Sequence, residues 1–243
     1  MARVLILGAT SDIAKALANE YAQHGYDLYL ATRQSDRLDP DIKDISIRYQ
    51  VNVKAFEFDA TAFETHASFY NELDPQPDGV ICVFGYLGDQ KKGEKMFSEA
   101  HKIIDVNHTG AISILEKIAA DFEHQKRGFI IGISSVAGDR GRQSNYLYGS
   151  AKAGFSAYLS GLRNRLFKSG IHVLTVKPGF VATKMTASLK LPPFLTAQPD
   201  TTAKAIYKAH IKKKDVLYVT GIWWWIMTFI RYIPEPIFKR LGL

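Results

Sequence analysis

The chain has 243 residues, of which 47% are hydrophobic and 23% are charged. This composition is that of a globular protein with its own apolar core, and it excludes a fibrous or intrinsically disordered chain. The one cysteine, Cys82, excludes an intramolecular disulfide and indicates a reducing compartment. The first residues lead directly into an apolar strand rather than a signal peptide, so we expect a cytoplasmic protein.

The formal net charge of +7 is compatible with nucleic acid, anionic lipid or a phosphorylated ligand as partner. Basic residues are spread along the chain, and the one dense run, residues 212–214, is typical of a solvated helix end. We therefore expect no nucleic-acid partner. The sequence gives no reason to expect a metal site either.

Seven short apolar runs, most of them closed by glycine or a polar residue, predict β-strands. Between them, apolar residues recur at helical spacing, and the first such stretch ends at Gly25, a typical helix stop. The predicted strands are residues 4–7, 27–33, 53–60, 79–85, 128–134, 171–179 and 215–221. The predicted helices are residues 12–25, 99–120, 145–167 and 201–212.

Strands that are apolar on both faces and alternate with helices indicate a mostly parallel sheet covered on each side. We therefore predict an α/β fold: a doubly wound, seven-stranded, Rossmann-like sheet with right-handed crossovers. No linker rich in Pro, Gly or Ser divides the chain, so residues 1–243 are expected to form a single domain. The proline-interrupted stretch at residues 183–200 is interpreted as a mobile loop over a substrate site.

The first strand, turn and helix read "LGATSDIAKA". A dinucleotide site needs a tight turn at the end of a strand and free backbone N–H groups at the start of a helix. Gly8 supplies the turn, but Asp12 and Ala14 stand where glycines are common, and Asp12 is also a good N-cap residue. The loop alone therefore fits a dinucleotide site and an ordinary strand–helix turn equally well.

The end of the second strand favours one dinucleotide over the other. NAD sites usually carry an acid there, whereas this chain has Thr32 and Arg33, with Arg37 nearby. A guanidinium suits a 2′-phosphate, so Arg33 indicates NADPH if a dinucleotide binds at all; a surface arginine is the alternative. Asp59, after the third strand, is either a hydrogen-bond acceptor for adenine or a turn residue.

A candidate chemical site follows the fifth strand. Tyr148 and Lys152 are four residues apart on a predicted helix and therefore share one face. A nearby ammonium favours the phenolate, so we expect Lys152 to lower the pKa of Tyr148 and make it a usable general acid or base. Ser135, at the end of the strand, would stabilise charge on a substrate oxygen. A chance tyrosine–lysine pair and an ordinary turn serine are the alternatives.

Taken together, the motifs resemble those of the short-chain dehydrogenase/reductase family in its single-domain form, along nearly the whole chain. Their order and spacing are highly specific, although each motif is weak alone. The matching stretches are "GATSDIA" from Gly8, Asp59, "VN" at 106–107, "ISSVAG" at 133–138, "YGSAK" at 148–152 and "KPGFVAT" at 177–183.

The resemblance implies a dinucleotide-binding catalytic domain with Asn107, Ser135, Tyr148 and Lys152 as the catalytic set. In the family, the asparagine kinks its helix and holds a water that relays protons to the lysine. Members are usually dimers or tetramers, so we expect a homo-oligomer. The cofactor-binding residues expected for NADP are Gly8, Thr10, Ser11, Asp12, Ile13, Arg33, Asp59, Ala60, Gly85, Tyr148, Lys152, Pro178, Val181 and Thr183.

Two departures from the family pattern stand out. The family commonly has "NNAG" after the fourth strand, and this chain has "CVFG", so Cys82 replaces an asparagine that usually ties neighbouring strands together. In the first loop, Asp12 is tolerable only if its carboxylate turns away from the dinucleotide pyrophosphate.

The C-terminal tail, residues 221–243, contains three consecutive tryptophans and a run too short to span a membrane, which takes about 20 residues. We leave three interpretations open: an interfacial anchor with Arg231, Lys239 and Arg240 on anionic lipid, a lining for a long apolar substrate, or a helix packed on the core or on another subunit. The tail and the stretch "FGYLGDQ" (84–90) are similar to those of bacterial reductases that act on lipid-linked keto-sugars, such as the decaprenylphosphoryl-2-keto-ribose reductases.

The sequence thus predicts an NADPH-dependent oxidoreductase that moves hydride between nicotinamide and a carbonyl or alcohol carbon. We expect the substrate to be a small or lipid-linked carbonyl compound, with peripheral contact at the inner membrane surface through the tail. The alternative from another class is a non-catalytic nucleotide-sensing scaffold of the same fold. An epimerase or dehydratase with retained NAD is disfavoured by Arg33.

Overall fold

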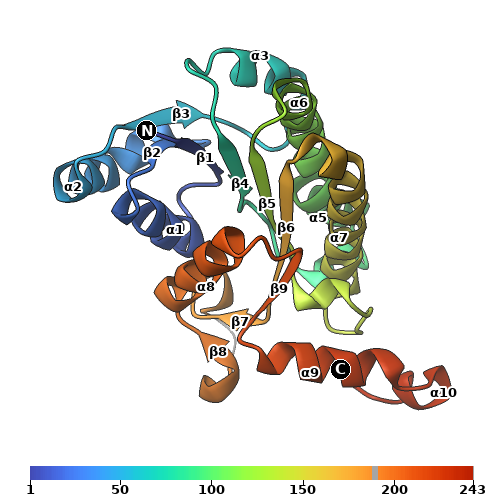
Figure 1. Ribbon diagram of the computed structural model, residues 1–243. Coiled ribbons are helices and arrows are strands. Elements are labelled where there is room, and N and C mark those ends of the chain that lie inside the picture. Colours follow the sequence, from blue (N-terminus) through green and yellow to red (C-terminus); the bar gives the residue numbers. More distant parts are fainter. Residues whose placement is uncertain (188–190, 243) are drawn as a thin grey trace.

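The computed structural model describes residues 1–187 and 191–242, and its centre is a seven-stranded β-sheet (Figure 1). The strand order is β3-β2-β1-β4-β5-β6-β9, and all neighbouring pairs are parallel. This confirms the fold predicted from the sequence. The strands are β1 (Arg3–Leu7), β2 (Asp27–Thr32), β3 (Val53–Glu57), β4 (Gly79–Cys82), β5 (Phe129–Ile133), β6 (His172–Pro178) and β9 (Val216–Val219).

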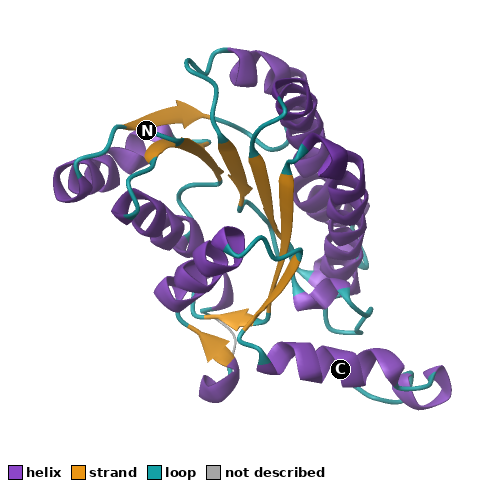
Figure 2. Ribbon diagram, viewed as in Figure 1, coloured by secondary structure: helices purple, strands orange, loops and turns teal. Residues whose placement is uncertain are grey.

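Helices lie on both faces of the sheet (Figure 2). Along each strand, side chains alternate between the two faces, so each face needs its own cover. Val4 and Ile6 of β1 enter one apolar core, whereas Leu5 and Leu7 enter the other. Helices α1 (Asp12–Gln23), α2 (Asp39–Tyr49) and α8 (Pro199–Ile211) cover the first core. Helices α3 (His66–Asn71), α6 (Gly110–Gln125) and α7 (Tyr146–Leu166) cover the second.

The predicted helix over residues 99–120 is wrong in one respect, because the structure divides it. Helix α5 (Phe97–Ile104) is followed by a π-helical turn (Asp105–Thr109) and then by α6. Within the turn, the Asn107 side chain donates to the Ile103 carbonyl at 2.8 Å, which widens the local helix. The sequence prediction also omitted α2, α3 and the short α4 (Gln90–Gly93).

The predicted loop at residues 183–200 contains regular structure where it is described. A second, two-stranded sheet pairs β7 (Phe180–Val181) with β8 (Thr196–Ala197), and α8 already begins at Pro199. Residues 188–190, which belong to the same predicted loop, lie outside the described residues.

The C-terminal tail forms α9 (Ile222–Tyr232) and α10 (Glu235–Phe238) and is fastened to the body of the protein. Trp223 and Met227, on the inner face of α9, are buried and pack in one cluster with Val136. The Arg140 guanidinium donates to the carbonyls of Ile230 (2.8 Å), Arg231 and Ile233 at the end of α9. The last carbonyls of a helix lack the full set of intrahelical partners, so Arg140 acts as a C-terminal cap beside the long bond from the Ile233 N–H to the Ile230 carbonyl.

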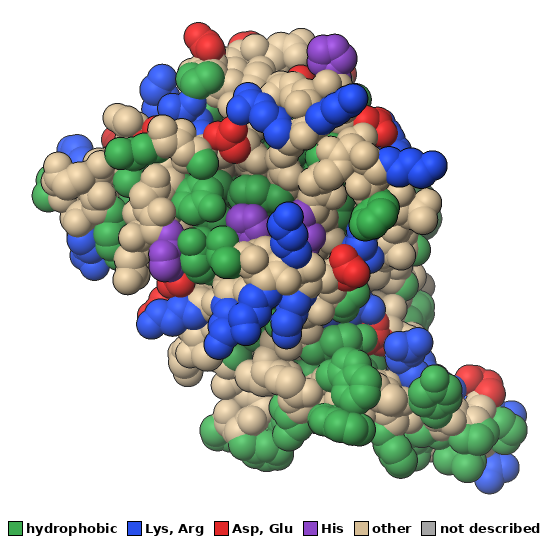
Figure 3. Space-filling view, viewed as in Figure 1, with side chains coloured by type: hydrophobic (Ala, Val, Ile, Leu, Met, Phe, Trp, Pro, Cys, Tyr) green, Lys and Arg blue, Asp and Glu red, His purple; other side chains and the backbone are tan. Residues whose placement is uncertain are grey.

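The outer face of α9 remains uncovered. Trp225, Phe229 and Tyr232 are 69%, 75% and 79% exposed, and their spacing places them on one stripe of the helix. Figure 3 shows hydrophobic side chains gathering over α9 and α10, with lysine and arginine side chains beside them. Across residues 1–187 and 191–242, none of the helices combines the length and the apolar character that crossing a bilayer requires.

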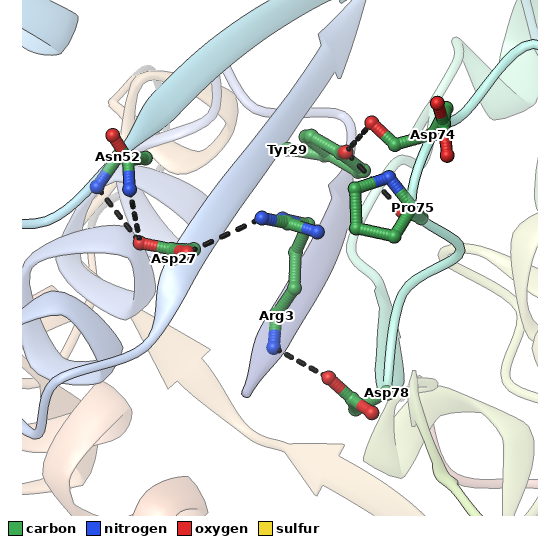
Figure 4. Close-up of polar contacts among 7 residues, drawn as sticks. All are labelled: Arg3, Asp27, Tyr29, Asn52, Asp74, Pro75 and Asp78. Atoms are coloured by element: carbon green, nitrogen blue, oxygen red, sulfur yellow. Dashed lines mark hydrogen bonds and ion pairs between the residues drawn. The ribbon is translucent and has the colours of Figure 1, made fainter. Parts of the chain in front are cut away.

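A polar network joins the strands at the amino end of β1 and β2 (Figure 4). Asp27 is 4% exposed, accepts from the Asn52 backbone N–H at 2.8 Å and forms an ion pair with Arg3 at 3.3 Å. The Arg3 backbone N–H donates to Asp78 at 2.8 Å, and the Tyr29 hydroxyl donates to the Asp74 carbonyl at 2.7 Å. This network links the amino ends of the strands, at the edge of the sheet opposite the candidate site.

Candidate active site

The tyrosine and lysine singled out from the sequence lie on one face of α7, beside the carboxyl end of β5. Lys152 is 3% exposed, and its Nζ donates to the Ile133 carbonyl at 3.0 Å. The same ammonium lies 5.8 Å from the centre of the Tyr148 ring. The Ser134 hydroxyl donates to the Lys152 carbonyl at 3.0 Å and fixes the helix against the strand.

Ser135 takes the position expected for a group that holds a substrate oxygen. It follows β5 and caps a short 3₁₀ turn, where its Oγ accepts from the Ala137 backbone N–H at 3.1 Å. Because the oxygen is occupied as an acceptor, the hydroxyl hydrogen is free to donate into the cavity. The neighbouring Ser134 has a structural task, since its hydroxyl also bonds Ser156 at 2.7 Å.

The ionisation of the pair differs from the expectation drawn from the sequence. Burial raises the pKa of Tyr148 to about 12, although the Ser135 hydroxyl acts in the opposite direction. Burial also lowers the pKa of Lys152 to about 8, against the effect of Cys82. The expected lowering of the tyrosine pKa is therefore wrong for the protein alone, because burial raises it more than the Ser135 hydroxyl lowers it. At neutral pH the phenol keeps its proton and suits the role of acid.

Asn107 lies behind the cavity rather than in its lining. Its side chain accepts from the Tyr86 backbone N–H at 3.2 Å and donates to the Tyr86 carbonyl at 2.6 Å. A Cβ atom on Gly85 would lie 2.9 Å from Asn107 Oδ1 and 3.4 Å from Lys152 Nζ. Asn107, Gly85 and Lys152 therefore converge, and a side chain at position 85 would separate them.

A cavity of about 820 Å³ runs along the carboxyl edge of the sheet and passes Ser135, Tyr148 and Lys152. It meets the sheet where β1 and β4 are neighbours and the chain order reverses, the place where doubly wound folds bind ligands. Its lining includes each residue expected to bind the cofactor: Gly8, Thr10, Ser11, Asp12, Ile13, Arg33, Asp59, Ala60, Gly85, Tyr148, Lys152, Pro178, Val181 and Thr183.

The turn into α1 resolves the question raised by Asp12. The N-cap is Ser11, whose Oγ accepts from the Ala14 N–H at 3.2 Å, so the N-cap role considered for Asp12 is wrong. The Asp12 carboxylate instead accepts from the backbone N–H of Lys184 at 2.7 Å. Gly8, with φ of +86°, makes the tight turn that only glycine adopts readily. The N–H groups of the first helical turn lack intrahelical partners and suit an anion.

The residues at the far end of the cavity fit a dinucleotide with an additional phosphate. Arg33 and Arg37 are exposed and line the cavity just beyond Thr32, the last residue of β2. Burial opposes ionisation of Asp59, but hydrogen bonds from Thr61 and the positive charge of Arg33 together lower its pKa. Asp59 therefore stays ionised as an acceptor, while the guanidinium groups offer donors for a phosphate.

At the other end, the cavity meets the tail. A Cβ atom on Gly179 would lie 2.0 Å from the indole of Trp223, so only glycine lets this helix approach the cavity so closely. The indole N–H donates to the Leu195 carbonyl at 3.1 Å, and the Trp223 and Phe180 rings meet edge to face at 5.1 Å. The inner face of α9 thus supports the cavity wall.

The lining also contains residues that were not singled out from the sequence as site residues, among them six with polar or bulky side chains. They come from three segments: the connection after β4 with α5, the connection between Ser135 and Tyr148, and the segment after β6. The sequence offered one indirect indication of these residues. A connection between two site residues begins and ends at the site, so some of its side chains are expected to line the cavity. The six are Tyr86, Lys102, Arg142, Asn145, Phe180 and Met185.

Comparison with known proteins agrees with this geometry. The sequence profile described as short chain dehydrogenase matches residues 2–192. An uncharacterized oxidoreductase of Mycobacterium tuberculosis is 33% identical over 244 residues, covering 99% of this chain and 97% of its own. One of Streptomyces coelicolor is 31% identical over 241 residues, covering 98% and 95%.

Among solved structures, a short-chain dehydrogenase from Sphingobium yanoikuyae in complex with NADPH superposes with a TM-score of 0.83. It is 23% identical, and the match covers 97% of both chains. The fold and cavity define a Rossmann-type oxidoreductase. The chain belongs to the short-chain dehydrogenase/reductase family, as the motifs predicted, and it is a nicotinamide-dependent oxidoreductase of that family.

Proposed function

We propose that the protein is an NADPH-dependent reductase of carbonyl compounds. The observation that carries this proposal is the joint placement of Ser135, Tyr148 and Lys152 on the wall of one cavity that also reaches Arg33. NADPH, when bound, supplies the hydride that adds to the carbonyl carbon. The residues of the chain then have to bind, orient and provide a proton.

Tyr148 gives its proton to the substrate oxygen as negative charge develops there. A pKa of about 12 keeps the phenol protonated at neutral pH while leaving it acidic enough to protonate an alkoxide. The Ser135 hydroxyl donates a hydrogen bond to the same oxygen and stabilises its charge. The Lys152 ammonium uses one N–H on Ile133, which leaves two for the ribose and for the phenolate that forms.

Asn107 completes the proposed proton path as a positioning residue. Its amide is held by the backbone of Tyr86 and Ile103, and its Oδ1 lies close to Gly85, on the same side as the Lys152 ammonium. This placement supports a water between Lys152 and bulk solvent that replaces the proton lost from Tyr148.

The choice of NADPH over NADH rests on Arg33 and Arg37. Both guanidinium groups are available at the end of β2, and Thr32 stands where an acid would bind the ribose of NAD. The relative from Sphingobium yanoikuyae, which was solved with NADPH, supports the same choice.

The direct test is oxidation of NADPH by the purified protein with a panel of carbonyl compounds, including long-chain ketones and polyprenyl-linked keto-sugars. We expect turnover with NADPH and much weaker turnover with NADH. Tight binding of NADPH without turnover of any compound would overturn the proposal and favour a nucleotide-sensing scaffold.

We further propose that the substrate is apolar or lipid-linked and that the outer face of α9 rests on an anionic membrane. Tyrosine and tryptophan prefer the membrane–water interface. Trp225 and Tyr232 are exposed on the outer face of α9, beside the exposed Phe229. Arg231, together with Lys239 and Arg240, places positive charge next to this stripe. Because Trp223 on the same helix touches the cavity wall, a membrane-bound substrate would have a short path to Tyr148.

Sedimentation with phosphatidylglycerol vesicles tests the membrane contact. We expect the wild-type protein to sediment, and a variant carrying Trp225→Ser and Phe229→Ser to remain in the supernatant. Phe167→Ser is the matched control, because Phe167 is 79% exposed but lies at the end of α7. Equal recovery of all three proteins in the supernatant would overturn the contact. A fall in oligomer mass confined to the double variant would assign the stripe to a second copy of the chain instead.

A further inference from the structure

The cavity wall next to Tyr148 contains a guanidinium that the proposed reaction does not use. Arg142 lines the cavity, and its Nε is buried without a hydrogen-bond partner. Among the described residues, the Arg142 side chain forms no hydrogen bond and no ion pair. Arg142 as a whole is partly exposed, so the rest of its guanidinium is open to the cavity. A partly buried cation without a partner costs free energy, which an anionic ligand would offset.

Asp139 is the acid that would be expected to neutralise Arg142, but it is already engaged. Its carboxylate forms an ion pair with Lys177 and accepts from the Tyr218 hydroxyl at 2.7 Å. The side chain of Asp139 is 3% exposed, which leaves no room for rearrangement. Burial accordingly lowers the pKa of Arg142, and Asp139 offsets this effect only in part.

A second unpartnered polar atom belongs to the same connection between Ser135 and Tyr148. Asn145 occupies the N-cap position of α7, where an asparagine side chain normally accepts a backbone N–H, yet it makes no such bond. Its Oδ1 is buried and has no partner, and the residue lines the same cavity. Arg142 and Asn145 therefore line the same cavity as Tyr148, and each holds a buried polar atom without a partner.

The charge of the cavity is divided along its length. Its described acidic lining residues are Asp12 and Asp59, both at the dinucleotide end and both bound to backbone N–H groups. The other charged residues of the described lining are all basic, and they include Arg142 and Lys102. The excess of basic lining residues therefore favours a negatively charged ligand.

We propose that the substrate carries an oxyanion, a carboxylate or a phosphoryl group, close to its carbonyl, and that Arg142 binds this group with Asn145 as a second hydrogen-bonding partner. The inference rests on the proposed reductase function, since it assigns the substrate class of the same site. A planar guanidinium binds either oxyanion through two parallel hydrogen bonds, which would orient the carbonyl toward Tyr148. Arg142 is thus a specificity-determining residue.

The first part of the test measures binding without turnover. Inorganic phosphate and acetate are titrated separately, at constant ionic strength, into protein saturated with NADP⁺, so that the phosphate sites of the dinucleotide are filled. We expect at least one of the two anions to bind wild-type protein, and the stronger one identifies the oxyanion. Arg142→Gln should weaken that binding roughly tenfold or more, whereas Arg48→Gln, an exposed arginine on α2, should leave it unchanged. Absence of binding to wild type would overturn the proposal.

The second part measures selectivity in turnover, using levulinate with its methyl ester and dihydroxyacetone phosphate with dihydroxyacetone. We expect wild type to favour the charged member of at least one pair. Arg142→Gln should remove this preference through a rise in KM for the charged compound, with the values for the neutral compound retained. An equal loss for both members would overturn the assignment. If no compound is reduced while the anion still binds through Arg142, the reductase function fails and the anion site stands.

A merely structural arginine would behave differently in unfolding. Removing a partly buried charge that has no partner relieves its desolvation, so Arg142→Gln should leave the Tm of the ligand-free protein unchanged or higher. Arg142→Lys should restore part of the preference for the charged substrate. A clear fall in Tm with both variants would show that Arg142 supports the fold and would overturn the proposed role.

Discussion

Two polar clusters at opposite edges of the parallel sheet, one around Asp27 and one around Arg142, differ in how their buried atoms are partnered. At the amino edge, Asp27 is surrounded by donors from Arg3 and Asn52. At the carboxyl edge, Arg142 and Asn145 keep buried polar atoms without partners. Asp27 is therefore fully partnered far from the cavity, whereas Arg142 and Asn145 keep unpartnered atoms in residues that line it.

Burial also has a different consequence in each cluster. Around Asp27, burial accompanies an ion pair that holds β1 and β2 together. Around Tyr148 and Lys152, burial changes proton affinity, raising one pKa and lowering the other. Mutations at the first edge should affect stability, and mutations at the second should affect function.

The largest effect on stability is expected for Asp27→Ala. Removing one partner of a mostly buried ion pair leaves Arg3 and the Asn52 N–H unsatisfied and should lower the free energy of unfolding by about 3–5 kcal/mol. Urea unfolding measures this loss, and kcat per folded molecule should be retained. Asp44→Ala is the control, because the exposed pair with Arg48 contributes about 0.5 kcal/mol or less. Equal losses for the two variants would contradict the division between the edges.

Ser135→Ala should show the reverse behaviour. Loss of a donor that stabilises a developing oxyanion typically lowers kcat about 10²–10³-fold. The free energy of unfolding should fall by about 1 kcal/mol or less, because the lost capping bond to Ala137 belongs to a short turn. Steady-state kinetics and urea unfolding on the same preparation decide the matter, and an unchanged kcat would remove Ser135 from the proposed chemistry.

Arg33→Ala should weaken binding of NADPH and have little effect on other properties. Loss of a charge-assisted contact to the 2′-phosphate should raise the Kd for NADPH about tenfold. The Kd for NADH should be nearly unchanged, since that dinucleotide lacks the phosphate. Fluorescence titration with both cofactors measures the difference. An equal rise in the Kd for NADPH and for NADH would mean that Arg33 does not contact the 2′-phosphate.

The pH dependence of stability should report the buried ammonium. The pKa of Lys152 is about 8 in the folded protein, below its ordinary value of 10.5, so the unfolded chain binds more protons between these values. The Lys152 contribution to stability should therefore rise with pH across this window. Urea unfolding of wild type and Lys152→Met should give a stability difference that shifts toward wild type from neutral pH to about pH 10. A difference that is constant with pH would contradict the burial of the charge.

Much of the fold was predictable because its strands are short apolar runs with clear ends. The buried sequence around Val4 and Ile6 and the wholly apolar β4 leave little choice but a sheet covered on both sides. Helix α2 was missed because it is mostly polar and buries Ile45 alone among its residues. The interruption at Asn107 was missed because the apolar period continues through it, and a side-chain hydrogen bond to Ile103 decides the local geometry.

The candidate site was predictable where sequence spacing reflects chemistry, as for Tyr148 and Lys152. The direction of the tyrosine pKa shift was not, because desolvation depends on tertiary burial that no spacing encodes. Arg142 was missed for a similar reason, since nothing in a polar connection shows which of its side chains turns inward. The tail left three interpretations open, and the structure shows one packed face around Trp223 and one exposed face around Trp225.

The central claim is that Tyr148 is the proton donor of an NADPH-dependent reduction, and Tyr148→Phe tests it most directly. With a reducible carbonyl compound from the panel, NADPH oxidation followed in a stopped-flow experiment should slow about 10²–10⁴-fold in the variant. The Kd for NADPH and the free energy of unfolding should stay close to those of wild type. Hydride transfer at the wild-type rate in Tyr148→Phe would contradict the account.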